Sequence, residues 1–135
     1  MRAIVVEEIG GPEVLRPTEA PDPVPGPGEV VVDLAARGVN FIEIYQRSGL
    51  YPVSLPWIPG SEGAGVVSAV GEGVTGVSVG SRVVSASLRG SYAERAVVAA
   101  EDLVPVPDGV SIEQAAAVLL QGLTAHYLTH STYPV

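Results

Sequence analysis

The chain has 135 residues, of which 47% are hydrophobic and 16% are charged, so it can bury a core and is not a disordered chain. It contains no cysteine and no lysine, which excludes disulfides, thiolate nucleophiles, cysteine-ligated zinc and Schiff-base chemistry. The net charge of −8 is unfavourable for binding a nucleic-acid backbone or an anionic membrane surface, so we expect neither as a partner.

The N-terminal part of the chain has the pattern of strands joined by turns. Residues 2–9 are predicted to form a strand that ends at the Gly-Gly-Pro turn of residues 10–12 and pairs with a short strand over residues 14–18. Alternating prolines in residues 21–27 predict an extended connection across the end of a barrel; a ligand for an SH3-type domain is the alternative interpretation. Residues 29–36 are predicted to form the next strand.

The pattern then changes to a helix and returns to strands. Asn40 is predicted to cap a short helix that ends at Gly49. Further strands are expected at residues 60–70, 81–86 and 91–99. Because the strands follow one another in series rather than alternating with helices, the pattern favours a mainly β fold, either an antiparallel barrel or a sandwich, with appended helices.

One long helix is predicted near the end of the chain, with Ser111 as its N-cap; Gly122 weakens it before residues 123–128 resume the pattern. Its predicted apolar stripe consists of Ile112, Ala115, Ala116, Leu119 and Leu120. Residues 114–135 carry no formal charge, but polar side chains interrupt them, so we do not expect a membrane-spanning segment. A soluble cytoplasmic protein is the simplest interpretation.

Two glycine clusters predict different local structures, a turn between strands and a fixed carboxylate. Residues 71–76 match G-x-G-x-x-G, but a β-branched, glycine-broken stretch follows where a phosphate-binding helix is needed, so a turn joining two strands is favoured over dinucleotide binding. Residues 59–67 place three glycines around the single acid Glu62 at the start of a strand. This pattern predicts close backbone approach and a fixed carboxylate, with a plain turn as the alternative.

Three segments, residues 38–52 (GVNFIEIYQRSGLYP), 59–67 (PGSEGAGVV) and 121–128 (QGLTAHYL), together resemble the medium-chain dehydrogenase/reductase superfamily. Within it the chain is similar to the zinc-free NADPH:quinone oxidoreductases, the zeta-crystallin-like group. The resemblance implies a GroES-like, partly open antiparallel β-barrel over residues 1–110, which forms the substrate and catalytic domain. Residues 111–135 would be the connecting helix that leads to a nucleotide-binding domain absent from this chain.

The resemblance also suggests the reaction. Zinc-dependent relatives carry a cysteine where this chain has Asn40 and a histidine where it has Ser61, and of their metal ligands only Glu62 remains. A catalytic zinc needs about three protein ligands, so no metal site is expected. Hydride transfer from NADPH to a quinone or an α,β-unsaturated carbonyl, without zinc, is therefore the implied reaction.

The resemblance implies roles for five residues. Asn40 and Tyr45 would contact the nicotinamide as catalytic and cofactor-binding residues, and Tyr51 would line the acceptor pocket. Gln121 and Thr124 would bind the cofactor's ribose or carboxamide. The alternatives are structural: Asn40 as only a helix cap, the tyrosines as barrel-rim aromatics and Thr124 as a helix-packing residue.

Further expectations concern partners and alternative functions. With most of the NADPH site in the missing domain, we expect the isolated chain to be inactive, and the full-length form is implied to be a homodimer. The helix side chains Leu119, Leu120, Leu123, Tyr127 and Leu128 are expected to be exposed without that domain. The alternatives are a non-catalytic GroES-like interaction module and a metal site at His126 and His130, which share one helix face.

Overall fold

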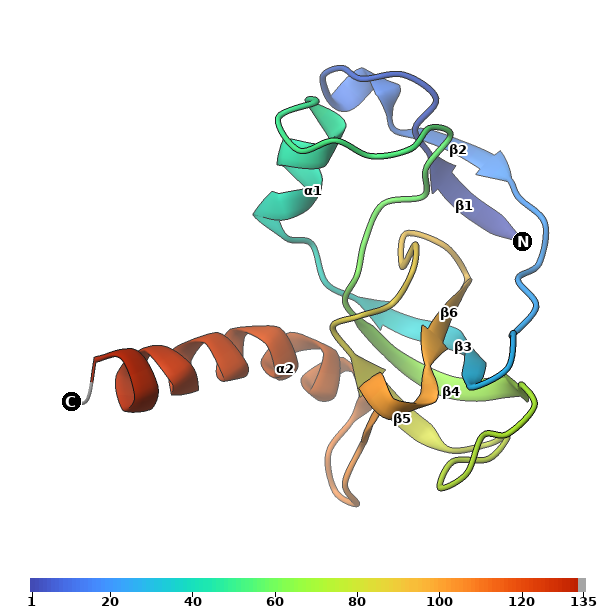
Figure 1. The fold of residues 1–135 in the computed structure, drawn as a ribbon, viewed down its shortest axis with the longest axis vertical. Coiled ribbons are helices and arrows are strands. Elements are labelled where there is room, and N and C mark those ends of the chain that lie inside the picture. The colour runs from blue at the N-terminus through green and yellow to red at the C-terminus, as the bar shows by residue number, and fades with distance from the viewer. Residues whose placement is uncertain (134–135) are drawn as a thin grey trace.

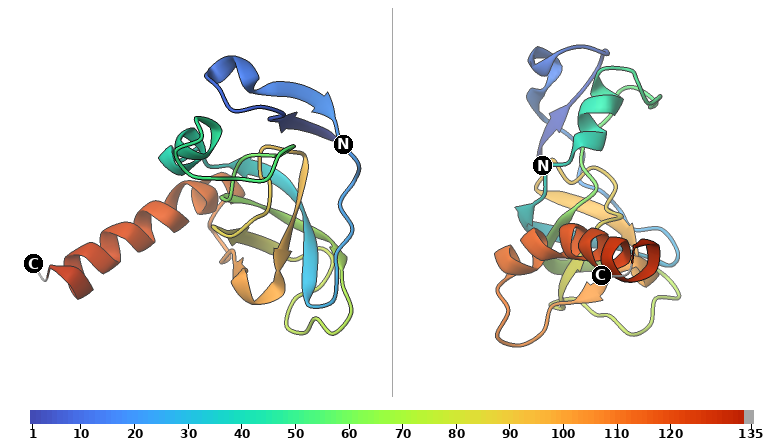
Figure 2. Two further views of the ribbon diagram at one scale, coloured as in Figure 1. Left: turned by 45° about the horizontal axis from the view of Figure 1, so that its top comes forward. Right: turned by 90° about the vertical axis from the view of Figure 1, so that its left-hand side faces the viewer.

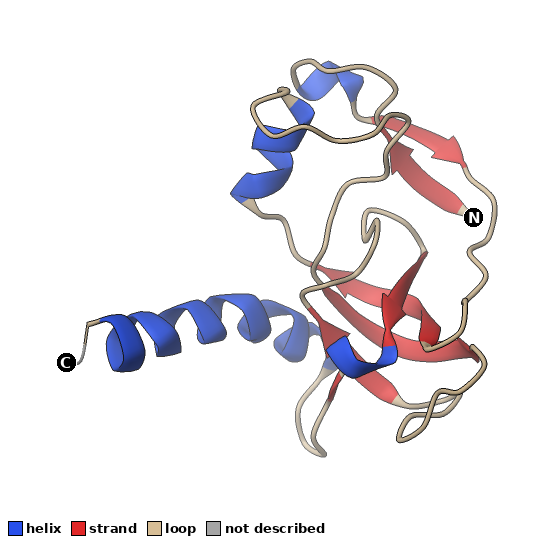
Figure 3. Ribbon diagram, viewed as in Figure 1, coloured by secondary structure: helices blue, strands red, loops and turns tan. Residues whose placement is uncertain are grey.

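The computed structural model describes residues 1–133 and contains two antiparallel sheets and two α-helices (Figures 1 and 3). The strands are β1 (Arg2–Val5), β2 (Arg16–Glu19), β3 (Glu29–Arg37), β4 (Gly63–Val70), β5 (Arg82–Ser85), β6 (Arg95–Ala99) and β7 (Val104–Pro105). The helices are α1 (Phe41–Arg47) and α2 (Ile112–Tyr127), with short helical turns η1 (Pro12–Val14), η2 (Ala100–Asp102) and η3 (Leu128–Thr132).

The larger sheet has the strand order β6-β3-β4-β5-β7, and β1 pairs with β2 in a separate two-stranded ribbon. Every pairing is antiparallel, and the ribbon stands apart from the larger sheet in Figure 1, so the barrel is open rather than closed. The mainly β, partly open architecture predicted for the chain is therefore confirmed.

Most local predictions agree with the structure, and the differences have simple causes. The first strand stops at Val5 instead of residue 9, and the second begins at Arg16 because the turn at Pro12–Val14 takes up the preceding residues. The glycine cluster of residues 71–76 lies in the connection between β4 and β5, as expected for a turn. Helix α2 continues through Gly122 to Tyr127, as the resumption of the helical pattern after this glycine predicts, because a single glycine weakens a helix by about 1 kcal/mol without ending it.

The larger sheet contains the main apolar core, which consists of Val30, Val32, Leu34, Val67, Val83, Leu88, Ala96 and Val98. A second cluster joins the first turn of α2 to the sheet through Ala64, Val84, Val106, Ala115 and Ala116. The predicted stripe of α2 therefore does face the sheet. Burial of apolar surface contributes about 25 cal/mol per Å² to stability, so this cluster stabilises the packing of the first turns of α2 on the sheet.

The C-terminal half of α2 projects away from the sheet, as Figure 1 and the left view of Figure 2 show. Leu123, Tyr127 and Leu128 are exposed as expected, whereas Leu119 and Leu120 are half-buried. The prediction for those two was wrong because they lie close enough to the body of the protein to pack against it. Within residues 1–133, no helix is long and apolar enough to cross a bilayer.

Candidate functional site

The N-terminus of α1 is built around Asn40, which follows β3 and adopts the extended conformation of an N-cap. The carboxylate of Glu43 accepts the backbone N–H of Asn40 at 2.5 Å and the hydroxyl of Tyr92 at 3.3 Å. Glu43 thereby satisfies one of the N–H groups that every helix start leaves without an internal partner. Asn40 therefore takes the N-cap position as predicted, and the local sequence N-x-x-E supplies the Glu43 carboxylate, whereas the Asn40 side chain makes no capping hydrogen bond among the described residues.

Glu43 is a buried acid beside this cap. Burial raises its pKa, while hydrogen bonds from Asn40 and Tyr92 and from the Ser61 backbone oppose the rise and the nearby Glu62 adds to it. Burial, together with the neighbouring Glu43, also raises the pKa of Tyr92 to about 12. Glu43 Oε1 has no hydrogen-bond partner among the described residues, so this carboxyl group is only partly compensated.

A second buried acid, Glu62, lies at the start of β4 and is fully enclosed. Its Oε2 accepts from Asn40 Nδ2 at 3.1 Å, and its Oε1 accepts from the backbone N–H of Leu120 at 3.2 Å. A Cβ at Gly38 would lie 2.0 Å from Oε2, so only glycine leaves room for this carboxylate. The fixed carboxylate predicted from the glycine cluster is present.

Helix α2 brings Gln121 and Thr124 to the same region. In the amide orientation that satisfies both of its polar atoms, Gln121 donates to Glu62 Oε1 at 3.3 Å and to the Ala117 carbonyl at 3.0 Å. Thr124 lies one turn further along and donates its hydroxyl to the Leu120 carbonyl at 2.8 Å. Asn40 and Gln121, which are 81 positions apart in the printed sequence, therefore meet at one carboxylate.

The two tyrosines form a separate exposed group, with Tyr45 on α1 and Tyr51 in the loop that follows it. The rings of Tyr45 and Tyr51 meet edge to face with centroids 5.5 Å apart, and the ring centroid of Phe41 lies 6.4 Å from that of Tyr45. Tyr45 is 38% exposed and Tyr51 48% exposed, so both can contact a ligand. The structure thus brings Asn40 and Gln121 together at Glu62 and the two tyrosines together at α1, whereas Thr124 joins neither group.

A cavity of about 520 Å³ lies beside α1. Its lining includes Ile42, Gln46, Trp57, Ser61 and Leu88, contributed by α1 and by loops distant in the sequence. Apolar walls with a few polar groups are typical of small-molecule sites. The aromatic, proline-stiffened sequence of residues 47–57 predicts a pocket wall, and the end of this loop at Trp57 does line the cavity.

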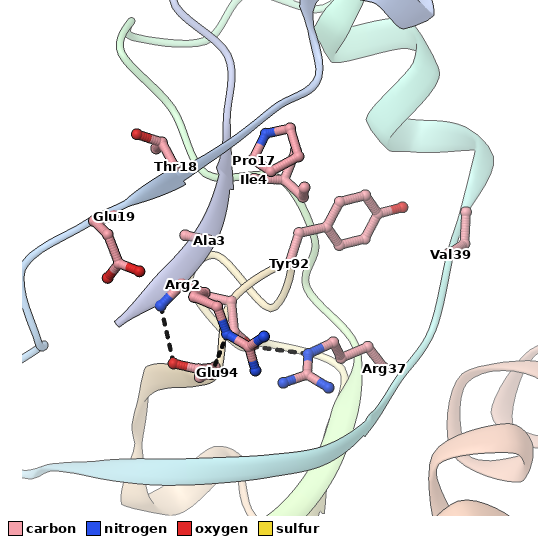
Figure 4. Close-up of a pocket in the computed structure, with 11 residues that line it drawn as sticks. Arg2, Ala3, Ile4, Pro17, Thr18, Glu19, Arg37, Val39, Tyr92 and Glu94 are labelled. Carbon is pink, nitrogen blue, oxygen red and sulfur yellow. Dashed lines mark hydrogen bonds and ion pairs between the residues drawn. The ribbon is translucent and has the colours of Figure 1, made fainter.

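A larger hollow of about 680 Å³ lies between the β1–β2 ribbon and the end of β3 (Figure 4). Its polar groups include those of Arg2, Arg37, Tyr92 and Glu94, and Arg2 pairs with Glu94 at 2.7 Å. None of the residues predicted for the site lines it. Tyr92 connects the hollow to the site, because its hydroxyl donates to Glu43.

No group of three or more potential metal ligands occurs among residues 1–133. His126 and His130 do share one helix face, but their rings stack 4.4 Å apart, and His130 Nδ1 lies within hydrogen-bond distance of Thr129 and of the His126 carbonyl. No acid completes a metal site with them in this part of the chain.

Known proteins show strong similarity to this chain. The family model of the alcohol dehydrogenase GroES-like domain matches residues 26–108. A Pseudomonas aeruginosa protein named quinone oxidoreductase is 54% identical over 126 residues, which is 92% of this chain and 39% of that protein. The chain therefore spans about two fifths of the length of the curated relatives it matches.

Solved structures give the same result. A mycobacterial protein in complex with NADPH superimposes with a TM-score of 0.96 at 55% identity, and covers 100% of this chain and 42% of its own. Escherichia coli quinone oxidoreductase in complex with NADPH gives 0.96 at 43% identity, with the same coverage. Because the family model matches more than half of the residues and the fold agrees throughout, the chain belongs to the alcohol dehydrogenase GroES-like domain family.

Proposed function

We propose that this chain is the substrate-side domain of an NADPH-dependent reductase that delivers a hydride to a quinone or an α,β-unsaturated carbonyl without zinc. The observation that carries the proposal is the agreement of the whole chain with the NADPH-bound quinone oxidoreductase of E. coli, at a TM-score of 0.96. The site geometry supports it, since amide, hydroxyl and aromatic groups gather around α1 and the adjoining part of α2.

The residues of this chain fit the nicotinamide end of the cofactor. Asn40 is half-buried, with one amide N–H fixed by Glu62, and Gln121 is exposed beside it. Within residues 1–133 no strand, glycine turn and helix follow one another in the way that holds a pyrophosphate, so we assign that part of the cofactor to the region beyond α2. Residues 111–135 would then connect the two domains.

NADPH, when bound, supplies the hydride. Asn40 and Tyr45 would orient the nicotinamide ring, and Gln121 and Thr124 would bind its carboxamide or ribose. Tyr51 and the cavity beside α1 would hold the electron-poor ring of the acceptor, with Ile42 and Trp57 excluding water. The contribution of these side chains is orientation and desolvation, which in general lower a barrier by fixing the reacting groups.

A chimera tests the proposal. The chain replaces the segment that it matches in the P. aeruginosa relative, and quinone-dependent NADPH consumption is measured. We expect activity, and we expect Asn40→Ala and Tyr45→Phe to lower kcat/KM by roughly tenfold, ~1.4 kcal/mol of positioning. Glu72→Gln, in an exposed turn, is the control that should leave the rate unchanged.

A chimera that melts cooperatively yet consumes no NADPH with any quinone or enone would refute the proposed function. Loss of activity on addition of a metal chelator would refute the zinc-free reaction. If the folded chain instead formed a ring oligomer that binds no nucleotide, the alternative of a non-catalytic interaction module would be correct.

We also propose that the complete protein is a cytoplasmic homodimer that acts on small molecules and has no nucleic-acid or membrane partner. The acidic composition supports the absence of polyanionic partners. Light scattering of the complete protein tests the dimer, and a monomer in solution would refute it.

A further inference from the structure

We propose that Glu62 is a positioning residue, whose buried carboxylate fixes the orientation of the Asn40 amide and ties it to α2. The consequence for the cofactor rests on the proposed function, because it assumes that Asn40 faces the nicotinamide. The hydrogen-bonded arrangement itself does not depend on that assumption and can be tested without a nucleotide.

The partners of Glu62 are all donors. Asn40 Nδ2, the Leu120 backbone N–H and the Gln121 side-chain amide reach its two oxygens, which is the pattern of an ionised carboxylate that only accepts. These donors come from the start of α1 and from the middle of α2. One side chain at the start of β4 therefore joins the two helices that present the predicted site residues.

The fixed element is the direction of the Asn40 amide. An asparagine amide has an accepting oxygen and a donating nitrogen, and only the nitrogen can face an acceptor such as Glu62. With the nitrogen held by Glu62, the oxygen is left for another donor, since the first turn of α1 makes no hydrogen bond to the Asn40 side chain among the described residues. A neutral partner able to both donate and accept would allow the amide to turn over.

The surroundings leave the carboxylate a single position. Glu62 is 0% exposed, its own carbonyl accepts from the Gly38 N–H at 3.0 Å, and the missing side chain of Gly38 provides the space for Oε2. Burying a charge costs free energy of desolvation, and apolar packing could join two helices without that cost. Because the carboxylate only accepts hydrogen bonds, it requires the Asn40 amide and the α2 backbone each to present an N–H to it.

The test exchanges the hydrogen-bond donor and acceptor between positions 40 and 62. Glu62→Gln keeps the shape of the side chain but offers a donor where Asn40 also donates. Asn40→Asp places two acceptors face to face and should lower the melting temperature strongly. In the double variant N40D/E62Q the new carboxylate at position 40 accepts from the new amide at position 62, so most of the lost melting temperature should return.

The control combines Asn40→Asp with Glu72→Gln, which removes the same charge at an exposed turn and should restore nothing. Equal recovery in this control, or no recovery in N40D/E62Q, would overturn the proposal. The orientation itself is read from the side-chain amide resonances of Asn40, which should shift in Glu62→Gln. Unchanged resonances would also overturn it.

Gly38→Ala provides the same test if Glu62→Gln does not fold, because the added methyl displaces the carboxylate without changing its chemistry. The Asn40 amide resonances should again shift, and unchanged resonances would refute the proposal. In the active chimera, Glu62→Gln should lower kcat/KM while the protein stays folded. A chimera without any activity refutes the proposed function and leaves the exchange of donor and acceptor to decide the role of Glu62.

Discussion

The sheet and the helix junction of this protein are built on opposite principles. The core of the larger sheet consists of valine, leucine and alanine side chains from β3 to β6. The junction between β4, α1 and α2 instead encloses two acids, Glu43 and Glu62, with hydrogen bonds that reach across the molecule. Apolar packing is nondirectional, whereas buried charges demand defined partners, so the two acids give the junction a fixed polar geometry that the apolar core does not need.

The proposed site lies at the junction rather than in the sheet. The sheet supplies stability that does not depend on the exact direction of any group. The junction fixes the direction of its hydrogen bonds but loses some stability, because Glu43 Oε1 is buried without a hydrogen-bond partner among the described residues. Variants in the two regions should therefore differ in what they change: stability alone in the sheet, and stability together with polar geometry at the junction.

Leu34→Ala should have the largest effect on the free energy of unfolding. Leu34 is 8% exposed in the sheet core, and its truncation leaves a cavity that should cost about 2–5 kcal/mol. Leu50→Ala, at a position 65% exposed, is the matched control and should change stability by less than about 0.5 kcal/mol. Urea unfolding measures both, and equal losses would contradict the assigned core.

The pH dependence of the free energy of unfolding tests the burial of Glu43 at the junction, and the expected change is smaller than that of Leu34→Ala. Because burial raises the pKa of Glu43, the unfolded chain ionises first as the pH rises. The stability that this group contributes is complete below its ordinary value of 4.5 and is lost as the pH rises through the higher folded pKa.

The stability of the unaltered protein minus that of Glu43→Gln should therefore fall as the pH rises from that value. Thermal melts over a pH series measure this difference. Glu72→Gln, which changes an exposed glutamate, should show no such fall. A difference that does not vary with pH would show that burial does not perturb Glu43.

The smallest expected effect is an increase in the free energy of unfolding. Gly122 lies inside α2, and an added Cβ would meet only Val118 Cγ1 at 3.4 Å. Gly122→Ala should therefore stabilise the protein by about 0.5–1 kcal/mol through helix propensity. Gly109→Ala is the contrasting variant, because a φ of +84° strains any side chain there. Unfolding midpoints compare the two, and a loss at Gly122 would mean that α2 is locally distorted.

The local features of the site could be predicted from the sequence. Ser111 caps its helix with its side chain and Asn40 takes the N-cap position of α1, as expected, because helix starts depend on residues within one turn. Glu62 was expected as a fixed carboxylate from the glycines around it, but its donors lie 22 and 58 residues away in the chain. No periodicity links such positions, so its partners could not be predicted. The loop of residues 47–57 was expected to be a pocket wall, but the tertiary structure decided that Ser61 and Leu88 complete the cavity.

The sequence by itself determined the serial strands, the two helices and their caps, because these follow from alternation, turn residues and contacts within a few positions. Only the tertiary structure decided the strand order β6-β3-β4-β5-β7, the separation of the β1–β2 ribbon and the meeting of Asn40 with Gln121 at Glu62. These features depend on which distant surfaces pack together, and packing is a property of the whole chain.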